Sequence, residues 1–349
     1  MKKDTIGFGI IGLGMIAEFH AKAIKEIPGC HLVAGYDQVP GKADSFCSQN
    51  GGRPYTSLDG FLSDKDLDIV TVATPSGLHL ESAAAAIVAG KNVIVEKPLE
   101  ISSSRCDRII QAAQRRGVML GTVFPSRYNE ASVLVKKAIQ SGRLGKIVLA
   151  DAQVKWWRNQ EYYDNRKQRG TLQYDGGGVL MNQGIHAVDL LQWLMGPVKE
   201  VTAFTDNLAH EQIEVEDTAV ASLRFESGSL GIIEGSTGAY PGFYKKIEIC
   251  GTGGSITLEE ENIVNWVFDR EEPRDEEIRR KFRNVGSTGG GASDPAAISP
   301  QGHRMLFSDF VNALRNNRPF AVDGPEGKKA VAIIEAIYRS AQTRTPVTL

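Results

Sequence analysis

Three small residues near the N-terminus have the spacing of a phosphate-binding turn. Gly12, Gly14 and Ala17 form the pattern GxGxxA between the apolar run Ile6 to Ile11 and a helical pattern. The first glycine allows a tight turn, the second lets the backbone approach a pyrophosphate, and the small third residue allows close helix packing. The helix N-terminus also attracts an anion. An isolated glycine-rich turn would carry little weight, but the order strand, turn, helix predicts a dinucleotide site. We expect its contacts to come from Gly12, Leu13, Gly14, Met15 and Ile16.

An aspartate at the end of the next apolar run bears on the choice between NAD and NADP. Asp37 follows the run His31 to Tyr36. A carboxylate there accepts hydrogen bonds from the adenosine ribose hydroxyls and repels a 2′-phosphate. The alternative is a helix-capping aspartate. No Arg or Lys follows Asp37 immediately to bind a phosphate, and Lys42, further along the chain, does not outweigh Asp37. The sequence therefore favours NAD over NADP.

A lysine follows another apolar run, Asn92 to Val95, in the sequence Glu96, Lys97, Pro98. In an open parallel sheet, ligands bind beyond the carboxyl ends of the strands, so we expect Lys97 to point toward the cofactor. Beside the cationic ring of an oxidised nicotinamide, like-charge repulsion favours a neutral amine, which could relay a proton or orient a hydroxyl group. The alternative is a surface lysine.

Three polar residues share one face of a predicted helix from Val179 to Met195. Asn182, His186 and Asp189 stand at positions i, i+4 and i+7, and apolar residues fill the rest of the pattern. Such a line is unusual for a merely buried helix and indicates the wall of a site. A single histidine on a helix is more often structural than catalytic, so the spacing alone does not make His186 a base.

The elements that position these residues follow from the hydrophobic pattern. Up to residue 124, short runs rich in Val and Ile alternate with amphipathic stretches, as in parallel strands joined by helices. The predicted strands are Ile6 to Ile11, His31 to Tyr36, Ile69 to Ala73, Asn92 to Val95 and Val118 to Val123. The predicted helices are Ile16 to Ile27, Leu78 to Ala89 and Ser103 to Arg116. This half is predicted to be a Rossmann-type, doubly wound parallel sheet, in a domain of residues 1–124.

The remaining residues, 125–349, are predicted to form an α+β domain with a large, mostly antiparallel, open sheet. A helix at Asn129 to Ile139 and a long strand from Ile147 to Trp157 come first. Further strand runs separated by short turns follow at Val198 to Phe204, Thr218 to Phe225, Leu230 to Glu234, Lys246 to Cys250, Gly254 to Leu258 and Ile263 to Phe268. We interpret Asp269 to Lys281 as a solvated charged segment and Gly286 to Gly291 as a flexible loop. Helices are predicted at Gly302 to Arg315 and Glu326 to Ala341, which could pack back on the first domain.

Composition limits the class of protein. Of the 349 residues, 42% are hydrophobic and 23% charged, and 40 basic against 42 acidic residues give a net charge of −2, too little positive charge for general nucleic-acid binding. Four cysteines without a CxxC pair fit neither a disulfide framework nor a thiolate zinc site, and we predict no metal. We find neither a signal peptide nor an apolar run long enough to span a membrane. We expect a cytoplasmic protein.

In combination, four motifs resemble the Gfo/Idh/MocA oxidoreductases. They are GLGMIAEFHAKAI, TPSGLH, EKP and GGGVLMNQGIHAVDLL, and the resemblance runs over essentially the whole chain. It implies that Lys97 lies beside substrate and nicotinamide, that the bond before Pro98 is cis, and that His186 accepts a proton. Many members have Asp four residues before that histidine, whereas Asn182 can hold a hydroxyl group but cannot act as a carboxylate base.

The resemblance further implies two groups of ligand contacts. The cofactor group is Thr74, Pro75, His79, Glu96 and Arg127. The substrate segment is KWWRNQEYYDNRKQRG, which contains Trp156, Trp157, Arg158, Tyr162, Tyr163, Arg166 and Arg169. From it we expect Arg158 or Tyr163 to contact substrate, together with Lys97, Asn182 and His186; the alternatives are a solvated basic loop and core aromatic residues.

The sequence thus predicts an NAD-dependent dehydrogenase that oxidises a secondary hydroxyl group of a sugar, glycoside, nucleotide sugar or inositol to a ketone. His186 would accept the proton, Lys97 would assist, and Asn182 would position a neighbouring hydroxyl group. One alternative is an enzyme that recycles bound NAD while cleaving or epimerising a glycoside. Another is a non-catalytic NAD-binding regulator. We expect a homodimer or homotetramer that binds neither nucleic acid nor membrane.

Overall fold

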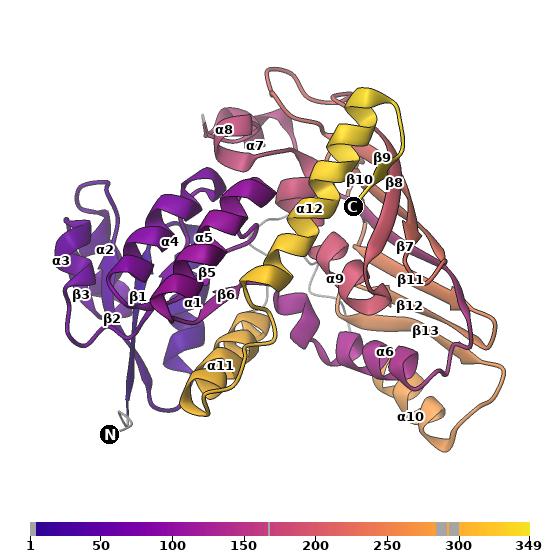
Figure 1. Ribbon diagram of the computed structural model, residues 1–349, viewed down its shortest axis with the longest axis horizontal. Coiled ribbons are helices and arrows are strands. Elements are labelled where there is room, and N and C mark those ends of the chain that lie inside the picture. The colour runs from indigo at the N-terminus through magenta and orange to yellow at the C-terminus, as the bar shows by residue number, and fades with distance from the viewer. Residues whose placement is uncertain (1–4, 167, 284–291, 293–299) are drawn as a thin grey trace. The chain divides into compact units, whose positions relative to one another are not determined.

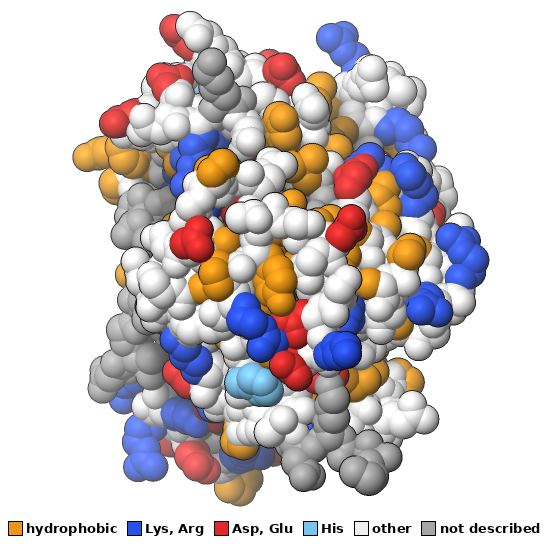
Figure 2. Space-filling view, turned by 90° about the vertical axis from the view of Figure 1, so that its left-hand side faces the viewer, with side chains coloured by type: hydrophobic (Ala, Val, Ile, Leu, Met, Phe, Trp, Pro, Cys, Tyr) orange, Lys and Arg blue, Asp and Glu red, His pale blue; other side chains and the backbone are white. Residues whose placement is uncertain are grey.

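The computed structural model describes residues 5–166, 168–283, 292 and 300–349. The chain forms two compact units, one of residues 1–125 and 300–331, the other of residues 126–299 and 332–349. Each unit is built on one sheet (Figure 1). Acidic and basic side chains are interspersed on the face that Figure 2 presents. Among the described helices, none combines the length and the apolar character needed to cross a bilayer.

The first unit is built on a six-stranded parallel sheet in the order β3-β2-β1-β4-β5-β6. Its strands are β1 (Ile6–Ile11), β2 (Cys30–Tyr36), β3 (Arg53–Tyr55), β4 (Ile69–Val72), β5 (Asn92–Val95) and β6 (Leu120–Thr122). The predicted doubly wound Rossmann sheet is confirmed. We predicted five of these strands and missed β3, an edge strand of three residues. The strand order reverses between β1 and β4, which is where such sheets bind ligands.

Helices cover the sheet of the first unit. They are α1 (Met15–Lys25), α2 (Lys42–Asn50), α3 (Leu58–Leu62), α4 (His79–Val88), α5 (Ser103–Arg116) and α11 (Gln301–Arg315), with a short 3₁₀ turn η1 (Ser76–Leu78) before α4. Although α11 is far along the chain, it packs on α1. Its Phe307 ring lies 6.1 Å from the Phe8 ring of β1 and 5.0 Å from the His20 ring of α1. The core of this unit is therefore formed by residues near the N-terminus together with residues of α11.

The second unit is built on an eight-stranded sheet in the order β13-β12-β11-β7-β10-β9-β8-β14. Its strands are β7 (Ile147–Lys155), β8 (Val198–Asp206), β9 (Thr218–Phe225), β10 (Leu230–Ser236), β11 (Lys246–Gly251), β12 (Gly254–Glu259), β13 (Asn262–Phe268) and β14 (Val347–Thr348). All neighbours are antiparallel except β7 and β10, which confirms the mostly antiparallel sheet. Buried and exposed residues alternate along β9, so one face of the sheet faces the core.

The helices of the second unit include several that the sequence did not predict. They are η2 (Pro125–Tyr128), α6 (Glu130–Gln140), α7 (Gln160–Asp164), α8 (Leu172–Asp175), the π-helical turn η3 (Leu180–Gly184), α9 (Ile185–Met195) and α10 (Pro273–Phe282), while α12 (Gly324–Thr343) contributes residues to both units. Helices α6 and α9 contact the sheet (Figure 1). The predicted charged segment Asp269 to Lys281 is mostly exposed, but it contains most of α10, whose buried Asp275 accepts hydrogen bonds from Trp266 (2.7 Å) and Arg143. The predicted loop Gly286 to Gly291 lies outside the described residues.

Candidate active site

The glycine turn follows β1 and opens α1, as predicted. Gly12 has a φ of +88°, and a Cβ atom there would lie 2.7 Å from the backbone nitrogen of Thr74, so only glycine fits without strain. Gly14 is the N-cap of α1; no side chain caps the helix there, and a Cβ atom on Gly14 would meet nothing within 4 Å. Uncapped N–H groups beside open space fit the pyrophosphate of a dinucleotide.

Asp37 follows β2 and is tied to this turn. Its carboxylate accepts hydrogen bonds from the backbone N–H groups of Leu13 (2.9 Å) and Val39 (3.0 Å), and Lys42 Nζ lies 2.8 Å from Oδ2. Burial opposes ionisation, but the hydrogen bonds from Lys42, Val39 and Leu13 outweigh it, so the pKa of Asp37 lies below its ordinary value. The carboxylate is therefore charged at neutral pH. The sequence did not anticipate that Lys42 would reach it.

The loops that follow β4 and β5 are joined by a buried histidine. His79 Nδ1 lies 2.8 Å from the carbonyl oxygen of Pro98, and Nε2 lies 3.0 Å from that of Thr74. The Lys97–Pro98 bond is cis, as the resemblance implied. Within residues 93–100 only Lys97 is not buried. These loops present Thr74, Pro75 and Lys97 at the carboxyl edge of the sheet. Both ring nitrogens of His79 are instead hydrogen-bonded to backbone oxygens of this unit.

A buried network of two histidines and a glutamate lies behind Lys97. Glu96 Oε1 is 2.8 Å from His20 Nε2 and 3.5 Å from His303 Nε2, and Oε2 accepts the backbone N–H of Lys97 (3.0 Å). Burial opposes ionisation of Glu96, but the hydrogen bonds from His20 and His303 hold its pKa well below its usual value. The carboxylate therefore anchors the backbone of Lys97 and turns away from the surface.

Neither His20 nor His303 was among the predicted site residues. His20 stands in the motif GLGMIAEFHAKAI, so the sequence held a signal for this residue. His303 lies on α11, and only the folded chain brings it to Glu96. Together with Glu96 they offer ligand atoms within 4.8 Å of one another and could hold a metal ion. Because His20 is already hydrogen-bonded to Glu96, and to Thr71 Oγ1 at 3.2 Å, we interpret the cluster as a hydrogen-bond network.

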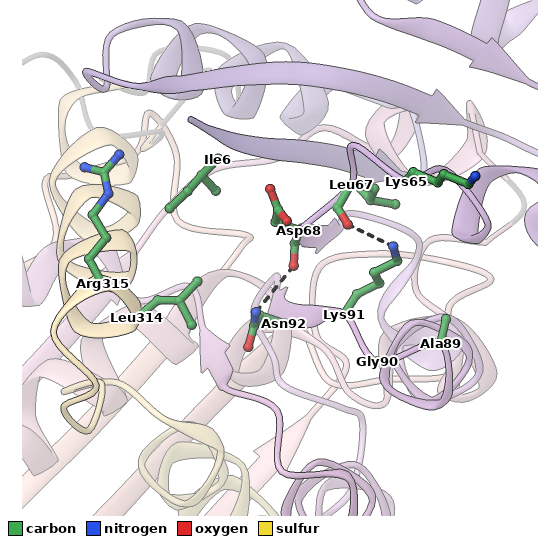
Figure 3. A pocket seen from close by; sticks show the side chains of 10 residues that line it. All are labelled: Ile6, Lys65, Leu67, Asp68, Ala89, Gly90, Lys91, Asn92, Leu314 and Arg315. Carbon is green, nitrogen blue, oxygen red and sulfur yellow. Dashed lines mark hydrogen bonds between the residues drawn. The ribbon is translucent and has the colours of Figure 1, made fainter. Parts of the chain in front are cut away.

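A pocket of about 500 Å³ lies at the opposite edge of this sheet, where the strands begin (Figure 3). Ile6 and Asn92 are the first residues of β1 and β5, and Asp68 immediately precedes β4. Lys91 also lines it and donates hydrogen bonds to the backbone oxygens of Leu67 (2.8 Å) and Asp64 (3.1 Å). This pocket is at the wrong end of the strands for the glycine turn, so it is not the predicted cofactor site.

In the second unit, η3 and α9 carry the predicted polar residues. Residues 180–184 are π-helical, so the helix predicted from Val179 to Met195 begins with one wider turn. Every residue from 177 to 192 is buried except Asn182 and His186. In this stretch, therefore, only the amide of Asn182 and the imidazole of His186 are partly exposed.

Asp189 and Arg127 form a buried ion pair within the second unit. Arg127 Nε donates to Oδ2 of Asp189 at 2.9 Å and Nη2 donates to Oδ1 at 2.6 Å. Asp189 is fully buried, unlike Asn182 and His186, so the interpretation of it as part of an exposed site wall is wrong. A direct contact of Arg127 with cofactor stays a prediction.

The predicted substrate segment follows β7 and contains α7. Tyr163 is buried, and its hydroxyl group lies 3.0 Å from Thr237 Oγ1. Arg158 is buried too, and its Nη1 donates to the backbone oxygens of Trp157 (2.7 Å) and Ala292 (3.1 Å). Both side chains are fixed by these contacts, and their contact with substrate stays a prediction.

Most of the remaining rings and cations of this segment are also packed against other side chains. The guanidinium group of Arg169 stacks on the Tyr162 ring, 3.9 Å from its centre. Trp156 is buried, and the Trp157 ring lies 5.4 Å from that of Tyr240. Arg166 is exposed. The alternative of a wholly solvated basic loop is therefore wrong.

Comparison with known proteins agrees with this geometry. Residues 6–124 match the model of an oxidoreductase family with an NAD-binding Rossmann fold, and residues 133–257 match the model of the GFO/IDH/MocA C-terminal domain. A crystal structure of the WlbA dehydrogenase from Bordetella pertussis in complex with NADH and UDP-GlcNAcA is 35% identical, with a TM-score of 0.87 over 99% of both chains.

Two curated relatives are also similar. Myo-inositol 2-dehydrogenase of Thermotoga maritima is 27% identical over 98% of both chains. 2,7-Anhydro-N-acetylneuraminate hydratase of Mediterraneibacter gnavus is 27% identical over 79% of this chain and 76% of its own length.

The chain belongs to the Gfo/Idh/MocA family of NAD-binding oxidoreductases, because the two family models together match more than half of it. This confirms the resemblance seen in the four motifs and disfavours a non-catalytic regulator.

Proposed function

We propose that this protein is an NAD-dependent dehydrogenase that oxidises a secondary hydroxyl group of a sugar, glycoside, nucleotide sugar or inositol to a ketone. The observation that carries the proposal is the selective exposure of Asn182 and His186 in an otherwise buried stretch. An amide and an imidazole are suited to hold one hydroxyl group and deprotonate another. The sugar and inositol dehydrogenases among the relatives support the same chemistry.

In this mechanism, bound NAD⁺ supplies an acceptor for the hydride of the carbinol C–H bond. His186 takes the hydroxyl proton, and Lys97 polarises that hydroxyl group or relays the proton. Asn182 holds a neighbouring hydroxyl group so that the reacting carbon is oriented. The Gly12–Ile16 turn and Asp37 hold the dinucleotide, and Thr74 and Pro75 line the same edge of the sheet. The carboxylate of Glu96 fixes the backbone from which Lys97 extends.

Among the substrate classes, we favour a nucleotide sugar that carries a carboxylate. The support is the WlbA structure with NADH and UDP-GlcNAcA, which aligns with this chain from end to end. The cationic side chains of Arg158 and Arg166 are suited to an anionic substrate. UDP-GlcNAcA is therefore the first compound to test.

The test is a panel of UDP-GlcNAcA, free sugars, glycosides and inositols incubated with NAD⁺ and the purified protein. We expect the NADH absorbance band to grow with at least one member, and UDP-GlcNAcA to have the highest kcat/KM. Oxidation of an inositol alone would overturn the substrate class but keep the dehydrogenase. No NADH from any member would contradict the function.

A second candidate is catalysis with recycling of bound NAD, and the hydratase among the relatives favours it. In such an enzyme, transient oxidation would activate the substrate for elimination or epimerisation without net redox change. The result that selects it is a product of altered structure, formed by protein that retains NAD, with no net gain of NADH.

Replacing Asp37 with serine is expected to reverse the cofactor preference, which we propose to be NAD over NADP. The variant loses a charged acceptor for the ribose hydroxyls, so kcat/KM with NAD⁺ should fall about tenfold, since such a hydrogen bond contributes roughly 1.5 kcal/mol. It also releases Lys42, 2.8 Å away, to bind a 2′-phosphate. Steady-state kinetics with both cofactors measures the ratio. Asp44→Ser, an exposed position in α2, is the control, and an unchanged ratio in Asp37→Ser would refute the role.

We also propose that the protein acts in the cytoplasm as a homodimer or homotetramer. The sheet of the second unit supports self-association, because adjacent strands expose apolar side chains. They include Leu149, Phe204, Val220, Leu230 and Ile232. Patches of this kind are characteristic of protein interfaces. Light scattering measures the subunit number, and a monomer would contradict this proposal.

A further inference from the structure

One residue binds three successive backbone N–H groups where the helix that carries His186 begins. Glu216 accepts the N–H of Gly178 at Oε2 (2.7 Å) and that of Leu180 at Oε1 (3.0 Å). Its backbone oxygen accepts the N–H of Val179 at 3.0 Å. The first N–H groups of a helix have no partner within the helix, so these bonds fix where the helix starts.

A tyrosine from α12 completes this arrangement. Tyr338 donates its hydroxyl hydrogen to Glu216 Oε1 at 2.8 Å. A Cβ atom on Gly177 would lie 2.3 Å from Tyr338 Oη, and one on Gly178 would lie 1.6 Å from the backbone oxygen of Glu216. The two glycines therefore allow the helix start to press against Glu216 and Tyr338. This accounts physically for part of the glycine run in the motif GGGVLMNQGIHAVDLL.

Asp217, the next residue along the chain, binds the backbone N–H groups of a different segment, residues 208–210. Asp217 accepts the backbone N–H groups of Leu208 (3.0 Å), Ala209 (2.7 Å) and His210 (2.9 Å), and its Oδ2 is 3.0 Å from His210 Nδ1. The other ring nitrogen of His210, Nε2, lies 2.9 Å from the backbone oxygen of Arg158. Asp217 is thereby connected to the predicted substrate segment.

The same histidine also packs on that segment, because its ring centre lies 4.7 Å from that of Tyr163. Thus two adjacent residues immediately before β9 hold two different predicted parts of the site. The carboxyl group of Asp217 is fully buried, and the side chain of Glu216 is partly buried. A buried carboxyl group is costly unless its hydrogen-bonding partners are in place, so each arrangement is stable only in the geometry seen here.

We propose that Glu216 and Asp217 are a pair of positioning residues, Glu216 for Asn182 and His186, and Asp217 for Arg158 and Tyr163. The proposal rests on the function above, in which His186 takes the proton of the reacting hydroxyl group and Asn182 holds a neighbouring one, and on the prediction that Arg158 or Tyr163 contacts substrate. Neither carboxylate touches substrate in this account. Disturbing Glu216 should therefore slow the chemical step, whereas disturbing Asp217 should weaken substrate binding.

Glu216→Gln tests the first half. The amide keeps the size of the side chain but replaces one acceptor oxygen with an NH₂ group, which cannot accept a hydrogen bond from a backbone N–H group. With NAD⁺ and UDP-GlcNAcA, kcat should fall about tenfold to a hundredfold, because a misplacement of about 1 Å can cost about 10²-fold. KM should change less than kcat, and NAD affinity should change little. The control is Glu260→Gln in the same unit, where a buried carboxylate accepts the N–H of Lys245 at 2.6 Å. Equal losses in both variants would overturn the positioning role.

Asp217→Asn tests the second half and should give the opposite division, with KM for UDP-GlcNAcA raised about tenfold or more and kcat nearly retained. The loss of one of several hydrogen bonds to a charged group, roughly 1.5 kcal/mol, corresponds to that factor. If both variants changed kcat and KM alike, the division of labour would be wrong.

Amide hydrogen exchange separates this proposal from the proposed function, because it needs no turnover. Peptides covering residues 177–182 should exchange faster in Glu216→Gln, and peptides covering 208–210 should exchange faster in Asp217→Asn. If wild-type protein oxidises nothing in the panel, the function fails while these shifts still report the anchoring. Unchanged exchange in both variants would overturn the anchoring itself.

A rescue experiment examines the contact with Tyr338. Gly177→Ala should lower kcat, and Tyr338→Phe in the same chain should restore part of it, because it removes the shortest contact, 2.3 Å to the hydroxyl oxygen, and leaves those of 2.8 Å to two ring carbons. A merely destabilising pair would instead show additive losses. Such additivity would contradict the role assigned to the Tyr338 contact.

Discussion

Alanine at His186 is expected to lower kcat about 10²- to 10⁴-fold, which is the range attributed to general acid–base catalysis by a positioned side chain. The imidazole is partly exposed between buried neighbours, and the carboxylate of Asp189 on the same helix is buried and bound by Arg127, so removing the imidazole leaves no exposed base on that helix. Asn182 cannot take over, because a carboxamide is not a base at neutral pH. NAD affinity should change less than kcat, since the proposed function assigns the binding of the dinucleotide to the glycine turn and Asp37.

Stopped-flow absorbance at the NADH band, with saturating NAD⁺ and UDP-GlcNAcA or whichever panel member is oxidised, measures this loss. His31→Ala, an exposed histidine of β2, is the matched control and should behave like wild type. Lys97→Met should also slow the reaction, because it removes the group that polarises the hydroxyl. Full activity in both His186→Ala and Lys97→Met would show that proton transfer has been assigned to the wrong residues.

Arg127→Met is expected to destabilise the protein by about 3–5 kcal/mol, the usual cost of removing one partner of a buried ion pair. Asp189 would remain charged and buried on α9 without the two hydrogen bonds that Arg127 donates. Denaturant unfolding measures the loss. Lys281→Met, which breaks the exposed pair with Glu130, should cost only about 0–1 kcal/mol.

The double variant Arg127→Met, Asp189→Leu decides whether Arg127 also serves the cofactor. Replacing both partners by apolar side chains should recover most of the stability, since no buried charge is left. If NAD affinity is then normal, Arg127 is a structural residue. If affinity stays low in the stable double variant, the contact with cofactor implied by the family resemblance is real.

The parts of the fold predicted from sequence are those with strong local periodicity. Helix α5 begins and ends at the predicted residues, Ser103 and Arg116, because a capping serine precedes it and Gly117 adopts the left-handed conformation after it. Strand β3 was missed because Arg53, Pro54 and Tyr55 are too few for an alternating pattern. Helix α10 was missed because its surface is so charged that the buried Ile278 and Phe282 gave little signal.

The site residues also divide into those that local sequence patterns predict and those that only the folded chain brings together. The glycine turn, Asp37, Lys97 and His186 could be found because they stand at fixed positions relative to strand ends and to one helix face. The role of Asp189 could not, because Arg127 lies 62 positions away in the chain. Glu216 and Asp217 stand outside the predicted helix and the substrate segment. Only the folded chain brings the carboxyl group of Glu216 to the start of that helix and the carboxyl group of Asp217 to His210, which contacts the substrate segment. Sequence patterns therefore located the reacting groups better than the residues that hold them.

The central claim is that a hydride passes directly from a carbinol carbon of a sugar to NAD⁺ on this protein. The most direct measurement uses UDP-GlcNAcA with fully deuterated sugar-ring carbons, NAD⁺ and a molar equivalent of protein in a single turnover. Mass spectrometry of the nicotinamide product should find one deuterium atom per molecule of reduced cofactor. Reduced cofactor without deuterium, or altered sugar with no reduced cofactor at any time point, would contradict the account.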